Sequence, residues 1–132
     1  MRFAMPHHPC EFEIPDDWLG SLSSRVSPSA GTGYNPSGPA TLVRLTDIQP
    51  PRRDRAFPLE WQGMERHRFV RVLERMVVGD EIDPVPLLPV PPLDSCTQLY
   101  PFVVYDGLHR FFASIVAGFD HLPAKIHQAP ER

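Results

Sequence analysis

Cysteine is scarce in this sequence, long apolar runs are missing, and basic residues do not outnumber acidic ones. Cys10 and Cys96 are too few for a disulfide scaffold and have no partner at metal-ligand spacing, so we expect a reduced protein without a metal site. No segment approaches the roughly 18 apolar residues that span a bilayer, and the N-terminal segment lacks the apolar stretch of a signal peptide. A cytoplasmic protein without a membrane partner is therefore expected.

Common catalytic signatures are absent as well. The sequence contains no Walker-type phosphate loop, no Gly-x-Ser-x-Gly elbow and no His-Glu-x-x-His metal motif. A formal net charge of -3 argues against a globally basic nucleic-acid coat, and it leaves room for a local basic face. With 132 residues, of which 42% are hydrophobic, the chain is large enough for one domain with a core.

Proline, by contrast, is abundant, with 17 residues in 132, or about 13% against a usual ~5%. Together with glycine and serine it sets residues 1–40 apart as an N-terminal arm that offers turns but no face to bury. Within this arm we predict a short helix over residues 16–22, anchored by Trp18 and Leu22. We expect the arm to lie on the domain or to reach a protein partner, and residues 41–128 to form the domain.

Alternating and periodic patterns predict the elements of this domain. Strands are predicted over residues 41–46, 84–90, 100–105 and 122–126. Helices are predicted over residues 60–78 and 108–117, with Gly79 and Gly118 as their C-terminal stops. Because Pro86 and Pro89 cannot donate to a ladder, the second strand is expected at a sheet edge or with a bulge. The resulting order predicts a single α+β domain, in which helices pack on one mixed β-sheet.

The segment between the third strand and the second helix carries the most chemistry. Gly107 has no side chain, so a ligand can approach the backbone closely there. The N–H groups of the first helical turn have no intrahelical acceptors and lie at the positive end of the helix dipole. Together they predict an anion site, for which phosphate is the commonest ligand. The alternative is ordinary turn chemistry, in which Asp106 caps the helix.

The side chains around Gly107 suit a phosphate group. Arg110 offers a planar fork of donors, and His109 can donate a hydrogen bond or carry a proton near neutral pH. Ser114, one turn after Arg110, can add a hydroxyl, and Asp106 can bind a metal–nucleotide or a hydroxyl group. Asp106 and His109 are thus the candidate catalytic residues. The candidate binding set consists of Gly107, Leu108, His109, Arg110, Ser114, Arg52 and Arg53.

Arg52 and Arg53 belong to an arginine-rich segment, residues 52–75, which holds seven arginines against four acidic residues. One interpretation is a face that binds a nucleotide or the phosphate backbone of a nucleic acid. The other is a solvated helix face with internal ion pairs, such as Glu65 with Arg68. We favour the second for residues 66–75 and the first for Arg52 and Arg53, which follow the first strand directly.

In combination, these features resemble the ParB/sulfiredoxin superfamily over about residues 41–127. The most specific part is the run Val104-Tyr105-Asp106-Gly107-Leu108-His109-Arg110, followed by the helix, Gly118 and Leu122-Pro123-Ala124. The superfamily includes ParB partition proteins, which bind and hydrolyse CTP and clamp DNA, ATP-dependent sulfiredoxins, and free-serine kinases. The resemblance implies a ParB/sulfiredoxin-like sheet and a nucleoside triphosphate ligand, ATP or CTP with magnesium, whose phosphates lie at residues 107–110.

Two departures from the superfamily shape the expected function. Leu108 stands where sulfiredoxins have their catalytic cysteine, so sulfinic-acid reduction is not expected. The run Gly107-Leu108-His109-Arg110 stands where ParB proteins usually have Gly-Glu-Arg-Arg. We expect a nucleotide-binding ParB-like domain that acts with a partner, with NTPase or small-molecule kinase activity left open. The alternative is a DNA-binding or nuclease-like accessory protein of a plasmid, phage or mobile element.

Overall fold

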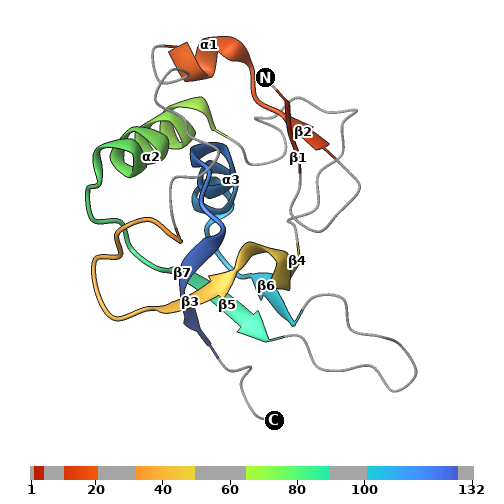
Figure 1. The fold of residues 1–132 in the computed structure, drawn as a ribbon, viewed down its shortest axis with the longest axis vertical. Helices are drawn as coiled ribbons and strands as arrows, with labels where there is room; N and C mark the ends of the chain where they lie inside the picture. The colour runs from red at the N-terminus through yellow and green to blue at the C-terminus, as the bar shows by residue number, and fades with distance from the viewer. Residues whose placement is uncertain (1, 5–10, 21–31, 50–64, 90–100, 128–132) are drawn as a thin grey trace.

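The computed structural model describes residues 2–4, 11–20, 32–49, 65–89 and 101–127 (Figure 1). A small two-stranded sheet and a one-turn helix come first, and a five-stranded sheet with two longer helices follows. In chain order the elements are β1 (Arg2–Ala4), β2 (Glu11–Glu13), α1 (Asp16–Leu19), β3 (Thr41–Arg44), the 3-10 turn η2 (Leu45–Asp47), β4 (Ile48–Gln49), α2 (Arg66–Val78), β5 (Val85–Pro89), β6 (Phe102–Val104), α3 (Leu108–Ala117) and β7 (His121–Ile126).

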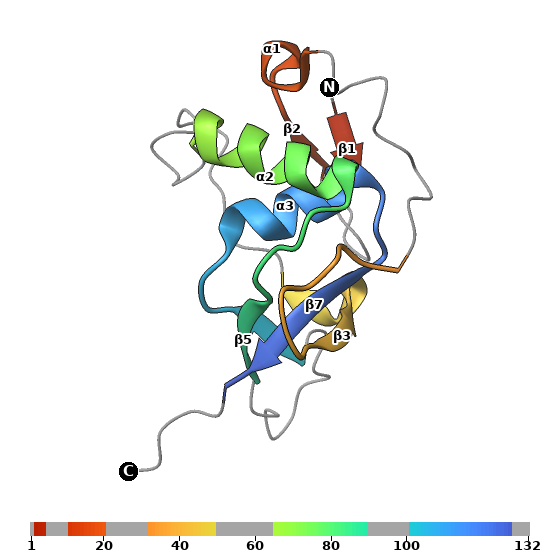
Figure 2. The same cartoon turned by 90° about the vertical axis from the view of Figure 1, so that its left-hand side faces the viewer.

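The large sheet is mixed, as predicted for an α+β domain. Its strand order is β3-β7-β5-β6-β4, with antiparallel pairing of β3 with β7 and of β5 with β6. The β7–β5 and β6–β4 pairs are parallel. Helices α2 and α3 lie next to each other on the same side of this sheet (Figures 1 and 2). The start of α3 therefore lies where the sheet and both helices meet.

The predicted position of the proline-containing strand was wrong, because β5 is the central strand of the five. Pro86 and Pro89 lie at positions of β5 where the lack of an N–H donor removes few hydrogen bonds from the sheet. The carbonyl of Pro86 accepts a 3.0 Å hydrogen bond from the N–H of Tyr105, which lies just past the end of β6. Pro89 is the last residue of β5. Pro86 is paired with Lys125 in the middle of the β5–β7 ladder, but its carbonyl faces β6, so its missing N–H falls just outside the β5–β6 register of residues 87–89.

The C-terminal ends of α2 and α3 were predicted correctly, and so was the start of α3, whereas α2 begins later than predicted within the described residues. Gly79 and Gly118 end α2 and α3 in the left-handed conformation, with φ of 82° and 92°. Helix α3 covers residues 108–117 as predicted. Glu65 is extended and precedes α2, and the predicted helical residues 60–64 lie outside the described residues. The first predicted strand is shorter than expected, because the chain turns at η2 after Arg44.

One hydrophobic core fills the space between the sheet and the helices. Phe111 and Phe112 of α3 are fully buried, and their rings meet edge to face at 5.3 Å. The described part of residues 1–40 also contributes buried side chains, namely Ile14, Trp18, Leu19 and Tyr34. Trp18 packs against Phe69 of α2 with ring centroids 5.9 Å apart. This part of the predicted arm thus lies on the domain, whereas Leu22 lies outside the described residues.

Candidate functional site

The corner between β6 and α3 is built around Gly107, the residue that precedes the helix. Gly107 has φ of 135° and ψ of 36°, and its carbonyl accepts the first helical hydrogen bond, from Phe111 N–H at 2.9 Å. No side-chain cap hydrogen bond is present at the start of α3, so Asp106 does not cap the helix here. The first-turn N–H groups therefore keep the donor capacity that the sequence predicted.

The need for glycine at this position comes from close packing within the chain. A Cβ at Gly107 would lie 2.8 Å from Cγ1 of Val85 and 3.2 Å from Nη2 of Arg110. The conformation itself also favours glycine, because side chains rarely adopt this φ. The space left by the missing side chain is therefore filled by a guanidinium and a core valine of the same chain, and is not open to a ligand as the sequence predicted.

Arg110 ties the corner to the start of β5. Its Nη1 donates to the carbonyls of Asp83 and Pro84, at 3.0 and 3.1 Å, and its Nη2 donates to the carbonyl of Asp106 at 3.3 Å. All three acceptors are neutral. Among the described residues no carboxylate lies within ion-pair distance of Arg110. The three hydrogen bonds hold the guanidinium in place, while its positive charge has no ion-pair partner among the described residues.

His109 joins the start of α3 to the start of α2. Its Nε2 accepts a 2.8 Å hydrogen bond from the backbone N–H of Glu65, so the neutral ring carries its proton on Nδ1. Burial lowers the pKa of His109, and the nearby Arg68 and Arg110 charges lower it further, against an opposing effect of Glu65. A neutral ring removes the conflict with the helix dipole that a charged histidine would create.

Acidification is expected to destabilise the protein through His109. Since the folded state holds the pKa of His109 below about 6.5, the unfolded chain takes up the proton first. Stability is therefore complete above about pH 6.5 and falls as the pH decreases toward the lowered value. Urea unfolding of the wild type and of His109→Gln, at about pH 8 and pH 5, measures how much of the pH dependence of stability comes from His109. The glutamine keeps an acceptor for the N–H of Glu65. Equal pH dependence in the two proteins would contradict the assignment.

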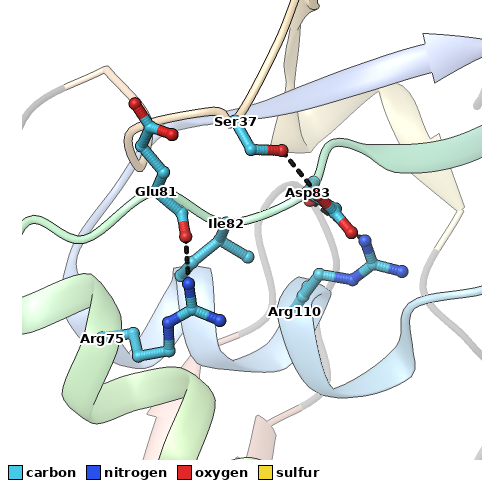
Figure 3. Close-up of a pocket in the computed structure, with 6 residues that line it drawn as sticks. All are labelled: Ser37, Arg75, Glu81, Ile82, Asp83 and Arg110. Carbon is cyan, nitrogen blue, oxygen red and sulfur yellow. Dashed lines mark hydrogen bonds between the residues drawn. The ribbon is translucent and has the colours of Figure 1, made fainter.

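A pocket of about 430 Å³ opens beside Arg110 (Figure 3). Its lining comes from α2, α3, the segment between α2 and β5, and the segment before β3: Ser37, Arg75, Glu81, Ile82, Asp83 and Arg110. The two extended segments are joined by backbone hydrogen bonds of Ser37 N–H to the carbonyl of Ile82 and of Ile82 N–H to that of Asn35. The Ser37 hydroxyl also donates to the Asp83 carboxylate at 2.5 Å.

Tyr34 contacts the Asp83 backbone, which borders this pocket, and was missed by sequence reasoning. Its buried hydroxyl donates to the carbonyl of Asp83 at 2.7 Å, the same oxygen that receives Arg110. Burial raises the pKa of Tyr34, and Asp83 raises it further against the opposing Arg110, so the hydroxyl stays protonated and donates. The only sequence feature that could have indicated a buried contact was a single tyrosine in a segment otherwise rich in Gly, Ser and Pro.

Ser114 does not reach the corner. Its side chain is fully buried on α3, and its Oγ has no hydrogen-bond partner among the described residues. Leu108 is partly buried and packs against the core. The predicted contributions of Arg52 and Arg53 lie outside the described residues.

The Ser114→Ala variant is expected to be more stable than the wild type by about 1 kcal/mol, because it removes a buried hydroxyl that has no hydrogen-bond partner in the described part of the chain. Urea unfolding of the two proteins at neutral pH measures the difference. A clear loss of stability in the variant would show that the hydroxyl has a stabilising role.

The arginines of α2 divide between ion pairs and the pocket. Arg68 pairs with Glu65 at 3.4 Å, as expected for a solvated helix face. Arg66 pairs with Asp17 of α1 at 3.4 Å. Arg75 instead lines the pocket, where its Nη2 donates to the carbonyl of Glu81. The prediction of a solvated face did not include this pocket contact of Arg75. Its neighbours in the pocket come from other segments of the chain, which a local pattern does not show.

Within the described ranges, no group of three or more His, Cys, Asp or Glu side chains is placed to hold a metal ion. None of the helices in these ranges has the length and apolar character that crossing a membrane requires. Comparison with protein-family models, curated proteins and solved structures gave no match to this chain.

Proposed function

We propose that this chain is a ParB/sulfiredoxin-like nucleotide-binding domain that holds the phosphates of a nucleoside triphosphate, ATP or CTP with Mg²⁺, at the β6–α3 corner. One observation carries the proposal. The Arg110 guanidinium lies over Gly107 at the uncapped start of α3 and lines an open pocket, with no carboxylate at ion-pair distance among the described residues.

The physical case rests on two kinds of donor at the start of α3, of which the Arg110 side chain lines the pocket. Backbone N–H groups at a helix start and a guanidinium fork both favour phosphate oxygens. The pocket volume of about 430 Å³ lies within the usual range of small-ligand sites. Arg110 is also held by backbone carbonyls, which reduces the ordering cost of binding.

Two further residues of the predicted site, His109 and Asp106, are assigned roles in this proposal. His109 is neutral with its proton on Nδ1, so this N–H can donate to a phosphate oxygen. Asp106 is exposed at the corner, and its carboxylate can share a Mg²⁺ ion with the phosphates, which is the usual mode for this ion. If phosphate transfer follows binding, these two side chains are the ones that act on it.

Thermal unfolding with ATP, ADP, CTP and GTP, each with Mg²⁺, tests the proposal. We expect at least one nucleotide to raise the Tm of the wild type, because binding to the folded state stabilises it. Arg110→Lys keeps the charge but loses the planar fork, so its shift is expected to be smaller. Arg71→Lys, the same change on the exposed face of α2, serves as the matched control. No shift with any nucleotide would overturn the proposal, and phosphate release separates an enzyme from a binding domain.

A further inference from the structure

Two guanidinium groups, not one, face the pocket. Arg75 comes from the last turn of α2 and Arg110 from the first turn of α3, and both line the same cavity of about 430 Å³. Figure 3 shows the two guanidinium groups at separate places along this cavity, with Ile82 between them. The arrangement joins residues 35 positions apart in the sequence, and no local pattern predicts it.

Both guanidinium groups are held by neutral acceptors. Arg75 donates to the carbonyl of Glu81, and Arg110 to the carbonyls of Asp83 and Pro84. Within the described part of the chain, neither arginine forms an ion pair with a carboxylate. The pocket thus has two positive charges in fixed positions.

Two acidic residues, Glu81 and Asp83, belong to the same lining. The Glu81 side chain points away from the Arg75 guanidinium, while its carbonyl points toward it (Figure 3). The Asp83 carboxylate accepts the Ser37 hydroxyl at 2.5 Å. The Arg75 and Arg110 side chains line the cavity at two separate places, so a ligand must offer anionic oxygens at two points to contact both.

We propose that Arg75 and Arg110 together bind two linked phosphate groups, so that the site prefers a diphosphate or triphosphate to a monophosphate. This inference rests on the proposed function of the β6–α3 corner and adds Arg75 to it. A single phosphate reaches one guanidinium, whereas two linked phosphates present separate oxygen pairs to both. Arg75 is thus the residue that selects the length of the phosphate chain.

Calorimetric titration of the full chain with phosphate, pyrophosphate, AMP and ADP, without added metal, tests the assignment. We expect the wild type to bind pyrophosphate and ADP about tenfold or more tightly than phosphate and AMP, as expected for one additional charge-assisted contact. Arg75→Gln is expected to abolish this preference. Arg71→Gln, an identical loss of charge one turn earlier on α2 and outside the pocket lining, is expected to retain it.

The outcomes separate the two proposals. If the wild type binds none of the four ligands, this inference fails, while the proposed function is judged separately by the Tm shifts with nucleotides and Mg²⁺. If the ligands bind but Arg75→Gln keeps the same preference as Arg71→Gln, the role of Arg75 is overturned and the corner site stands. A wild type that binds phosphate and pyrophosphate equally well would also overturn the role of Arg75.

Discussion

Gly107→Ala is expected to lower the free energy of unfolding by about 3 kcal/mol, from a strained backbone and an overpacked neighbour. The new methyl group would lie 2.8 Å from Cγ1 of the buried Val85, and φ of 135° is rarely adopted by a residue with a side chain. It would also push on the Arg110 guanidinium, 3.2 Å away at Nη2. Urea unfolding monitored by circular dichroism measures the loss.

Gly79→Ala is the matched control for this change. Gly79 also has a positive φ, of 82°, but a Cβ there would meet no atom within 4 Å. Its replacement is therefore expected to cost about 1 kcal/mol, which is the backbone part alone. Equal losses in the two variants would show that the contacts with Val85 and Arg110 add nothing.

Local patterns were sufficient for the elements that depend on local physics. Helix α3 could be predicted at both ends, because an apolar face at helical spacing and a C-terminal glycine are properties of one short segment. The position of β5 could not be predicted in this way. The proline rule concerns ladder hydrogen bonds, and which of them a strand needs depends on partners distant in the sequence, here β6 and β7.

The candidate site shows the same division. Gly107, His109 and Arg110 could be selected from their spacing next to a helix start. Their hydrogen-bond partners could not be predicted in this way. Glu65 is 44 positions from His109 in the sequence, and Asp83, whose carbonyl accepts from Arg110, is 27 positions from it. Tyr34 and Arg75 join the site only through such long-range contacts. The sequence thus selects candidate residues, and tertiary contacts decide which of them face one another.

Arg110→Ala is expected to lower the free energy of unfolding by about 3 kcal/mol, since it removes three charge-assisted, partly exposed hydrogen bonds, two to the residues just before β5 and one within the corner. Arg110→Lys is expected to recover part of this loss, because an ammonium can reach fewer of the three carbonyls. Arg71→Ala, on the exposed face of α2, is expected to change stability by less than about 0.5 kcal/mol. A loss no larger for Arg110→Ala than for Arg71→Ala would contradict the structural role of Arg110.

A double-mutant cycle with Tyr34→Phe tests the same contact at its shared atom. The carbonyl of Asp83 accepts from both Tyr34 and Arg110, so either single variant leaves it with one donor. Among the described residues, only the double variant leaves this partly exposed oxygen without a donor, which costs about 1 kcal/mol, at the low end of the range for unpaired acceptors. We therefore expect the double variant to lose more stability than the sum of the two single losses. Additive losses would mean that water replaces the missing donors, and that Asp83 does not link the segment before β3 to the start of α3.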